Sequence, residues 1–321
     1  MGGERTVSRC AKRTKKMSTD KQALVQALKD KRDAEGLSVR ALSEKIGVSF
    51  SSLARILRGE GEPDNNSTIR ILQWLGPDAG DRSLQMDGVA LVHFRAAKNV
   101  SSKTVECLLK AANSMREGDQ FDPQNSDLGL AVSLSKPEME EIANEFRSDL
   151  SLNRGDPLDA LDVRISGVEV FAASRAEFLD ETCAQYLLGP ASNEWSAMSV
   201  PRDVTDDTWA ILRNDSHSIE RQRVTYLEEC WHILLGHKLT RIAKVGDAYG
   251  RTYDSSEEHD AYFLASACLL PEADVRELVK AGESAKEIAA QFGTSMELAE
   301  YRIKRLGLWR AYQNRSIDLQ G

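Results

Sequence analysis

The sequence lacks any long uninterrupted hydrophobic run. Its apolar stretches all fall short of the roughly 18 residues that a membrane-spanning helix needs, so no membrane partner is expected. The first residues, MGGERTVSRCAKRTKKM, are basic, and no apolar segment follows them as a secretory signal would require. We therefore expect a soluble protein of the cytoplasm.

Cysteine is scarce and irregularly spaced. The chain has five cysteines, an odd number, and no C-x-x-C pair. Scattered cysteines of this kind fit free thiols in a reducing compartment better than a disulfide framework. We therefore predict five reduced thiols, at Cys10, Cys107, Cys183, Cys230 and Cys268.

Positive charge is also limited, since 42 lysines and arginines face 50 acidic residues and give a net charge of −8. This balance argues against a protein covered with nucleic acid. Basic residues nevertheless gather in residues 1–17, where a solvated tail is favoured over a DNA-contacting arm. A length of 321 residues exceeds what one core organises and predicts two or three compact units.

Residues 20–75 have the pattern of short packed helices. Ser38 is placed to cap a helix over Val39–Ile46, Gly47 supplies a tight turn, and Ser49 is placed to cap the next helix. Two short helices joined by a glycine turn form the helix-turn-helix geometry. Its second helix presents N-terminal side chains to the major groove of DNA.

This segment resembles the XRE (Cro/C1-type) helix-turn-helix family over about sixty residues. The matching residues are Leu37, Ser38, Leu42, Gly47, Val48, Ser49, Ile56, Arg58, Gly59 and Pro63. Val39 departs from the pattern, because the family commonly has a phosphate-contacting glutamine there. The resemblance implies binding to double-stranded operator DNA by a homodimer. An interaction domain without DNA binding is the alternative. The implied groove-facing residues are Ser49, Phe50, Ser51, Ser52 and Arg55.

The stretch TYLEECWHILLGH differs at one position from the zinc-peptidase pattern H-E-x-x-H. In that pattern two histidines one turn apart hold the metal, and the glutamate activates water. Here Glu228 stands at the first histidine, Glu229 at the glutamate and His232 at the second histidine. Glu228 and His232 lie one helical turn apart at the edge of the apolar arc, so both can point into one cleft.

An acidic residue, Asp260, precedes a helix that is apolar nearly all the way round and ends at Pro271. A carboxylate at the head of a buried helix needs a compensating charge. Glu228, Glu229 and Asp260 would repel one another without a cation, so their convergence predicts a bound metal ion.

RVTYLEECWHILLGH, followed by the acidic-Ala-x-x-apolar-Ala pattern that runs to LLP, resembles the ImmA/IrrE metallopeptidase-like family over residues 135–309. The resemblance implies His232 and Asp260 as metal ligands, Glu228 in the place of the first ligand and Glu229 as general base. It implies one divalent ion. Zinc is expected first, with manganese or iron as alternatives because two carboxylates make a harder site. Peptidases of this family cut helix-turn-helix repressors. The resemblance therefore implies a transcription regulator that cleaves such a repressor, or its own linker near residues 78–133, in response to a signal.

Three outcomes stay open for this variant motif: a zinc peptidase, a site that senses another cation, or an empty site whose glutamates form a charged edge. His237 is expected to cap the helix end, and a ligand role for His259 is not favoured.

The predicted fold class is α+β and mostly α. It comprises an all-α helix-turn-helix domain and a zincin-like α+β domain with β-rich segments at GVEVFAA, EWSAMSV and TWAILRN. SAKEIAAQFGTSMELAEYRIKRLGLW predicts a closing helix-turn-helix-like subdomain whose basic residues serve packing rather than DNA contact. The predicted order is a basic extension (1–17), the helix-turn-helix domain (18–77), a helical linker (78–133), the metallopeptidase-like domain (134–275), the C-terminal subdomain (276–312) and a tail (313–321).

Overall fold

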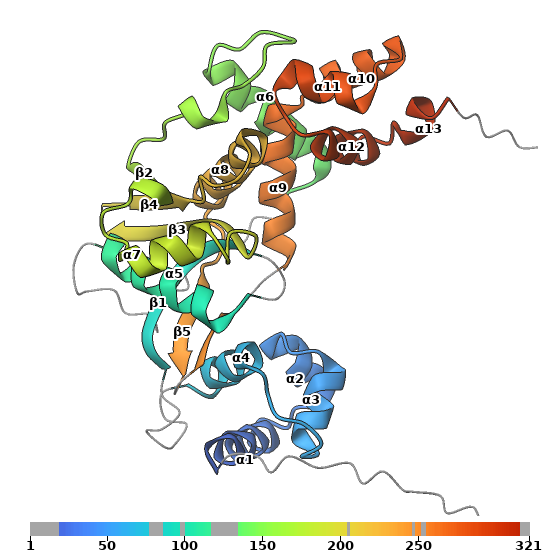
Figure 1. Cartoon of the computed structure of the whole chain (residues 1–321). Helices are drawn as coiled ribbons and strands as arrows, with labels where there is room; N and C mark the ends of the chain where they lie inside the picture. The colour runs from blue at the N-terminus through green and yellow to red at the C-terminus, as the bar shows by residue number, and fades with distance from the viewer. Residues whose placement is uncertain are drawn as a thin grey trace, which may run out of the picture. The chain divides into compact units, whose positions relative to one another are not determined.

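The computed structural model describes residues 19–76, 86–96, 100–116, 134–203, 206–245, 248–251 and 255–314. The chain divides into two compact units, Met1–Met86 and Asp87–Gly321 (Figure 1). Helices predominate and a mixed sheet lies among them, which confirms the α+β, mostly α fold class. Within the described ranges, no helix has both the length and the apolar character needed to cross a membrane.

The first unit packs its described helices around one apolar centre, as the sequence predicts. They are α1 (Thr19–Ala34), α2 (Val39–Ile46), α3 (Phe50–Leu57) and α4 (Asn65–Leu75). Leu28, Leu42, Leu53 and Ile69 are fully buried. Burial of each such side chain contributes about 1.5–3 kcal/mol. Gly47 ends α2 with φ 67°, the left-handed conformation that favours glycine, and turns the chain into α3.

The second unit is built on a six-stranded sheet with the strand order β2-β4-β3-β1-β5-β6. Its strands are β1 (Met86–Ala96), β2 (Val168–Ala172), β3 (Trp195–Asp203), β4 (Thr208–Arg213), β5 (Thr240–Val245) and β6 (Ala248–Arg251). β2, β3 and β4 are the three predicted β-rich segments. β2 runs parallel to β4, whereas β3 runs antiparallel to both β4 and β1.

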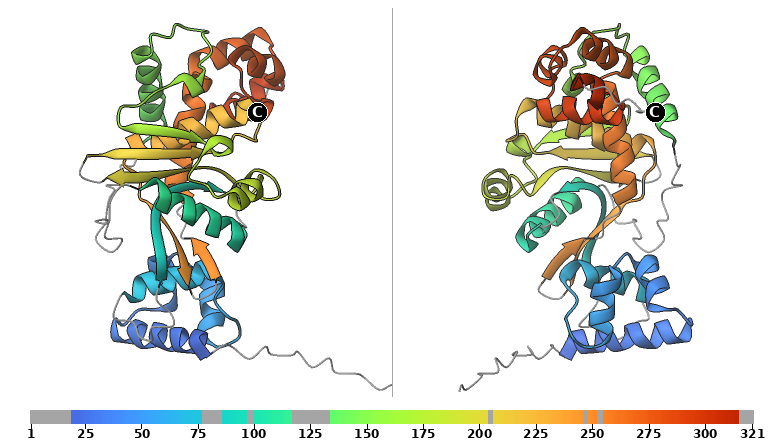
Figure 2. Two further views of the ribbon diagram at one scale, coloured as in Figure 1. Left: turned by 60° about the vertical axis from the view of Figure 1, so that its left-hand side comes forward. Right: turned by 90° about the vertical axis from the view of Figure 1, so that its right-hand side faces the viewer.

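Helices cover both faces of this sheet (Figures 1 and 2). The helices of the second unit are α5 (Ser102–Met115), α6 (Lys136–Asp149), α7 (Glu181–Leu188), α8 (Ile219–Leu234), α9 (Ser255–Leu269), α10 (Glu272–Ala281), α11 (Ala285–Phe292), α12 (Met296–Arg305) and α13 (Trp309–Tyr312). Phe94 and Met198 share a core with α5 and α7, whereas Ile211 shares one with α8 and α9. Because neighbouring residues of a strand point to opposite faces, His93 and Ser199 face α8.

The prediction of a helical linker over residues 78–133 is corrected in its described parts. β1 pairs with β3 inside the sheet, and α5 buries one face that includes Val105, Leu108 and Ala112. Both elements therefore belong to the second unit. A strand whose partner lies about a hundred residues further along the chain has no local signal that separates it from a connecting segment. Residues 117–133 lie outside the described residues.

Two cysteines form a disulfide, which corrects the prediction of five reduced thiols. Cys107 of α5 is bonded to Cys183 of α7, and both are buried. Cys230 and Cys268 are free, and burial raises the pKa of each thiol to about 12, so both stay protonated. Cys10 lies outside the described residues. The bonded pair is 76 residues apart in sequence, and only the packing of α5 against α7 brings it together.

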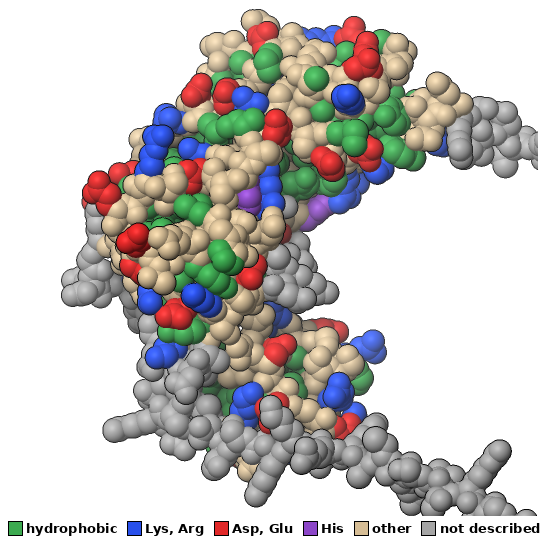
Figure 3. Space-filling view, in the orientation of Figure 1, with side chains coloured by type: hydrophobic (Ala, Val, Ile, Leu, Met, Phe, Trp, Pro, Cys, Tyr) green, Lys and Arg blue, Asp and Glu red, His purple; other side chains and the backbone are tan. Residues whose placement is uncertain are grey.

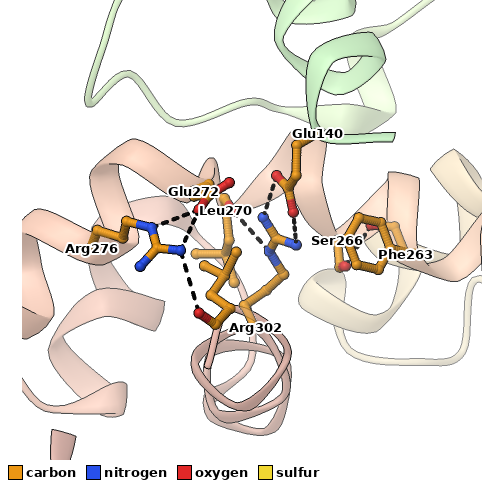
Figure 4. A network of polar contacts seen from close by, with 8 residues as sticks. Glu140, Phe263, Ser266, Leu270, Glu272, Arg276 and Arg302 are labelled. Carbon is orange, nitrogen blue, oxygen red and sulfur yellow. Dashed lines mark hydrogen bonds and ion pairs between the residues drawn. The ribbon is translucent and has the colours of Figure 1, made fainter. Parts of the chain in front are cut away.

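The C-terminal helices form the predicted helix-turn-helix-like arrangement, although α10 crosses the expected boundary between residues 275 and 276. Arg302 of α12 is fully buried and donates two hydrogen bonds, of 2.8 and 2.9 Å, to the carboxylate of Glu140 on α6 (Figure 4). Its Nε donates to the carbonyl of Leu270 at 3.0 Å. Arg302 therefore joins α12 to α6 and to the segment after α9, which is a packing role.

Candidate metal centre and DNA-binding helix

Helix α8 carries the acidic residues expected at the metal site. It begins after the N-cap Ser218, whose side chain accepts a hydrogen bond from the backbone of Arg221. The eight consecutive residues Thr225–His232 are all buried, whereas a helical wheel predicts one buried arc. The reason is that β3 and α9 both pack against this helix. Glu228 and Glu229 have no exposed surface, so each carboxylate needs a donor or a cation beside it.

The structure brings Glu228 and His232 together with Glu258 of α9. One potential ligand atom of each lies within 4.8 Å of those of the others. His232 Nε2 and Glu258 Oε1 are 3.9 Å apart. That separation is too long for a hydrogen bond.

Asp260, the predicted third ligand, does not belong to this group, and Glu258 occupies the place expected for it. Two residues along a helix correspond to a rotation of about 200°, so Asp260 projects from the opposite side of α9. Helix α9 begins at Ser255, about one and a half turns earlier than the apolar run alone indicates. Ala261 and Ala265 are buried on one side of α9, and Glu258 lies on the same side one turn before Ala261. This spacing is the sequence signal that would have identified Glu258 as the third ligand.

The predicted general base, Glu229, is hydrogen-bonded to the sheet. Its Oε2 accepts a hydrogen bond of 2.8 Å from Ser199 Oγ of β3, and Ser199 is itself fully buried. A charge-assisted hydrogen bond of this kind restricts the orientation of the carboxylate. Ser199 was not identified from the sequence, because a lone serine in a strand carries no signal of its partner.

His93 of β1 is a buried member of the site that sequence analysis missed, since β1 was assigned to the linker. Its Nδ1 lies 3.1 Å from Ser199 Oγ, and its Nε2 lies 2.9 Å from the carbonyl oxygen of His237. Its ring stacks on that of His232, with a centroid separation of 5.0 Å, and on that of Trp209. Burial lowers the pKa of His93 to about 4, which favours the neutral ring at neutral pH.

His237 follows the end of α8 and turns back toward the candidate metal ligands. Gly236 has φ 59°, and the backbone N–H of His237 donates to the carbonyl of His232 at 3.1 Å. This pattern is a Schellman motif, in which a left-handed glycine reverses the chain at a helix end. The motif brings His237 Nδ1 to 2.9 Å from His232 Nδ1. The expected capping role is thus joined by a side-chain contact with a candidate metal ligand.

The donor set of Glu228, His232 and Glu258 fits a small divalent cation. Two tetrahedral ligand atoms that each lie ~2.0–2.2 Å from one ion are ~3.3–3.6 Å apart, so the 3.9 Å between His232 and Glu258 would have to shorten by a few tenths of an ångström when an ion binds. Two carboxylates and one imidazole are ligands that zinc accepts, and they also suit manganese and iron. His259, in contrast, contacts Arg305.

Of the predicted DNA-contacting residues, Ser49 to Ser52 lie at the start of α3 and Arg55 lies in its last turn, and all of them are exposed. Ser49 caps α3 by accepting a hydrogen bond from the backbone N–H of Ser52, and Phe50 exposes 56% of its surface. Ser51 and Arg55 lie on the exposed side of α3, opposite its buried residues. The helix is therefore held by its inner face and presents the predicted side chains outward. On the face drawn in Figure 3, acidic and basic side chains are interspersed rather than gathered by sign.

Two family models match the chain. Residues 28–73 match the Helix-turn-helix model, and residues 194–304 match the Peptidase M78 model, described as the IrrE N-terminal-like domain. The chain joins a helix-turn-helix domain to an IrrE-like domain. The predicted fusion is confirmed, and the two matches support a DNA-binding regulator that carries a peptidase-like domain. Comparisons with curated proteins and with solved structures gave no match.

The two matched regions contain the candidate sites. The helix-turn-helix match includes α2 and α3, with the exposed residues at the start of α3. The IrrE-like match includes β3, α8 and α9, and hence the three candidate ligands and Glu229. β1, which contributes His93, lies before the matched region.

Proposed function

We propose that this protein is a cytoplasmic, DNA-binding transcription regulator whose IrrE-like domain is a metal-dependent endopeptidase. The observation that carries the proposal is the meeting of Glu228, His232 and Glu258, with the buried carboxylate of Glu229 beside them on α8. A zinc-binding peptidase helix uses this relation between ligands and base. Glu228 supplies an oxygen ligand where the pattern has an imidazole, and the spacing between the two helix ligands and the general base stays the same.

In this proposal the three ligands hold one divalent ion, zinc first and manganese or iron as alternatives. Such an ion would lower the pKa of a bound water and polarise the scissile carbonyl. Glu229 accepts the proton of the attacking water and then delivers it to the leaving amine. Ser199 keeps the Glu229 carboxylate in one orientation throughout.

The proposed substrate is a helix-turn-helix repressor or the chain itself. Self-cleavage was expected between residues 78 and 133. Within that range, residues 86–96 are paired in the sheet and α5 is packed in a core. A peptidase needs an extended, accessible backbone, so the segments 86–96 and 102–115 do not suit cleavage.

For the helix-turn-helix domain, we propose that α3 enters the major groove of operator DNA as part of a homodimer. Phe50, Ser51 and Ser52 at the start of this helix, and Arg55 in its last turn, would reach base edges and phosphates. In this proposal the IrrE-like domain controls whether the helix-turn-helix domain occupies its operator.

The second candidate function is a DNA-binding regulator with a catalytically silent domain that senses a metal or holds none. The observation that favours it is Glu228 itself, because one ligand of the peptidase pattern is replaced. A carboxylate brings negative charge to the ion and makes it a weaker Lewis acid than an imidazole ligand does.

Metal analysis and cleavage assays on the purified full-length chain separate these functions. The wild type and Glu229→Gln are compared for bound zinc, manganese and iron, and for hydrolysis of a fluorescence-quenched peptide library with each metal added. We expect equal metal content and loss of hydrolysis in the variant, because Glu229 is a base and not a ligand. Absence of hydrolysis in both proteins, with metal bound, would favour the sensing function. Absence of both bound metal and hydrolysis would rule out the enzymatic function.

DNA binding is tested separately with operator fragments selected from a random library. Arg55→Ala should weaken binding by about 5–150-fold in fluorescence anisotropy, since an Arg contact to a base edge contributes about 1–3 kcal/mol. Equal binding by the two proteins would contradict the assignment of α3 to the groove.

A further inference from the structure

The two ring nitrogens of His232 face different partners. Nε2 faces Glu258 at 3.9 Å, and Nδ1 lies 2.9 Å from Nδ1 of His237. Two ring nitrogens at that distance form a hydrogen bond only if one donates and the other accepts. A histidine that binds an ion through Nε2 carries its proton on Nδ1. Metal binding by His232 therefore requires His237 Nδ1 to be the acceptor.

His237 is held in place from a second side. The carbonyl oxygen of His237 can only accept, so the 2.9 Å contact makes His93 Nε2 the donor. Nδ1 of the neutral ring is then an acceptor, so the single proton of the Ser199 hydroxyl faces two acceptors, Glu229 Oε2 at 2.8 Å and His93 Nδ1 at 3.1 Å. The Schellman motif at Gly236 fixes the backbone at the same point. His93 in turn lies opposite Ser199 in the β1–β3 ladder and stacks on the ring of His232. Strand β1 and the end of α8 thus hold the same imidazole.

We propose that His237 and His93 are positioning residues of the metal site. His237 keeps His232 in the form whose Nε2 lone pair faces Glu228 and Glu258, and His93 keeps His237 where it can accept the Nδ1 proton. Neither histidine is a ligand in this arrangement. The inference rests on the proposed metal site and adds the residues that orient one of its ligands.

The expected size of the effect follows from other sites of this kind. A ligand histidine usually donates its second N–H to a fixed acceptor, and loss of that acceptor weakens metal binding by about 10–100-fold. The usual acceptor is a carboxylate or a backbone carbonyl. Here it is a second imidazole, which accepts only while its Nδ1 is unprotonated.

The test is titration of the metal-free full-length protein with Co²⁺, followed by its visible absorption and by competition with Zn²⁺. His237→Ala should weaken Co²⁺ binding by about 10–100-fold. His237→Asn places an amide oxygen close to the position of Nδ1, so its affinity should stay within about threefold of the wild type. Equal affinity of the wild type and His237→Ala would overturn the proposal.

Two matched substitutions separate the contacts of His93. The amide nitrogen of His93→Gln reaches the position of Nε2 and can still donate to the carbonyl of His237, whereas His93→Asn keeps only the side that faces Ser199. We expect Co²⁺ affinity near that of the wild type for His93→Gln and a loss like that of His237→Ala for His93→Asn. The same loss in both variants would overturn the role given to the carbonyl contact.

A measurement on the unsubstituted protein covers the case in which a variant does not fold. In zinc-loaded protein labelled with ¹⁵N at histidine, His232 should show a protonated Nδ1, and His237 should show an unprotonated Nδ1. A protonated His237 Nδ1 would overturn the inference while leaving the metal site intact. Failure of the wild type to bind either Co²⁺ or Zn²⁺ would instead remove the proposed metal site, and this inference with it.

Discussion

Ser199 Oγ of β3 lies 2.8 Å from Glu229 Oε2 of α8, and both residues are fully buried. The hydrogen bond joins the central sheet to the proposed general base. It gives Glu229 one preferred orientation before any substrate arrives, which is the kind of support that a reacting group needs.

Replacement of Ser199 by alanine should therefore slow catalysis without removing the metal. A hydrogen bond to a charged group contributes about 1.5–3 kcal/mol, so kcat for peptide hydrolysis should fall by about tenfold or more. The matched control is Ser196→Ala on the same strand, whose hydroxyl accepts from Arg221. An equal effect of the two substitutions, or a loss of bound metal in Ser199→Ala, would contradict the positioning of Glu229.

The assignment of the third ligand predicts a contrast between two acidic residues of α9. Glu258→Gln should lower zinc affinity by at least about tenfold, because an amide is a poorer ligand than a carboxylate. Asp260→Asn, two positions away, should leave it unchanged, since Asp260 is outside the ligand group. Isothermal titration with Zn²⁺ on both variants decides the matter, and the reverse order of affinities would restore Asp260 as the ligand.

Restoring the missing histidine should alter the choice of metal. In Glu228→His a nitrogen ligand replaces an oxygen ligand, so zinc affinity should rise by about tenfold while manganese affinity falls. Glu228→Gln removes the charge without adding a nitrogen and should weaken both metals. Competition between Zn²⁺ and Mn²⁺ measures the ratio. A ratio that stays the same in Glu228→His would show that Glu228 is not a ligand.

Phe50 predicts an apolar contribution to operator recognition. Its exposed ring at the start of α3 is suited to contact a thymine methyl group, so Phe50→Ala should weaken operator binding about tenfold. Met296 starts the corresponding helix of the C-terminal subdomain and is 46% exposed. Met296→Ala is therefore the control and should not alter DNA binding. A larger effect from Met296→Ala would assign DNA contact to the C-terminal subdomain instead.

The buried pair of Arg302 and Glu140 predicts a large change in stability. Arg302→Met leaves the Glu140 carboxylate without its partner and should lower the free energy of unfolding by about 3–5 kcal/mol. The double variant with Glu140→Leu should recover part of that loss, because no buried charge remains. Lys304→Met, on the exposed side of α12, should change stability by less than about 0.5 kcal/mol. Urea unfolding measures all three, and equal losses in the single and double variants would contradict this account.

Local signals in the sequence were sufficient for the helix-turn-helix domain and for part of the candidate site. Ser38, Gly47 and Ser49 cap and turn α2 and α3 through contacts within a few residues, so the pattern alone predicts both helices. Glu228, Glu229 and His232 are spaced on one helix, so their proximity follows from helix geometry. The strands β2, β3 and β4 likewise carry their own β-rich composition.

Only the tertiary structure decided the rest, because the contacts join segments far apart in the chain. His93 and Ser199 meet through the β1–β3 ladder, and Glu258 reaches His232 only when α9 packs on α8. The rotational setting of α9, which selects Glu258 over Asp260, depends on where that helix begins. Sequence therefore determined the chemistry of α8 itself, while long-range packing determined which side chains complete and support it.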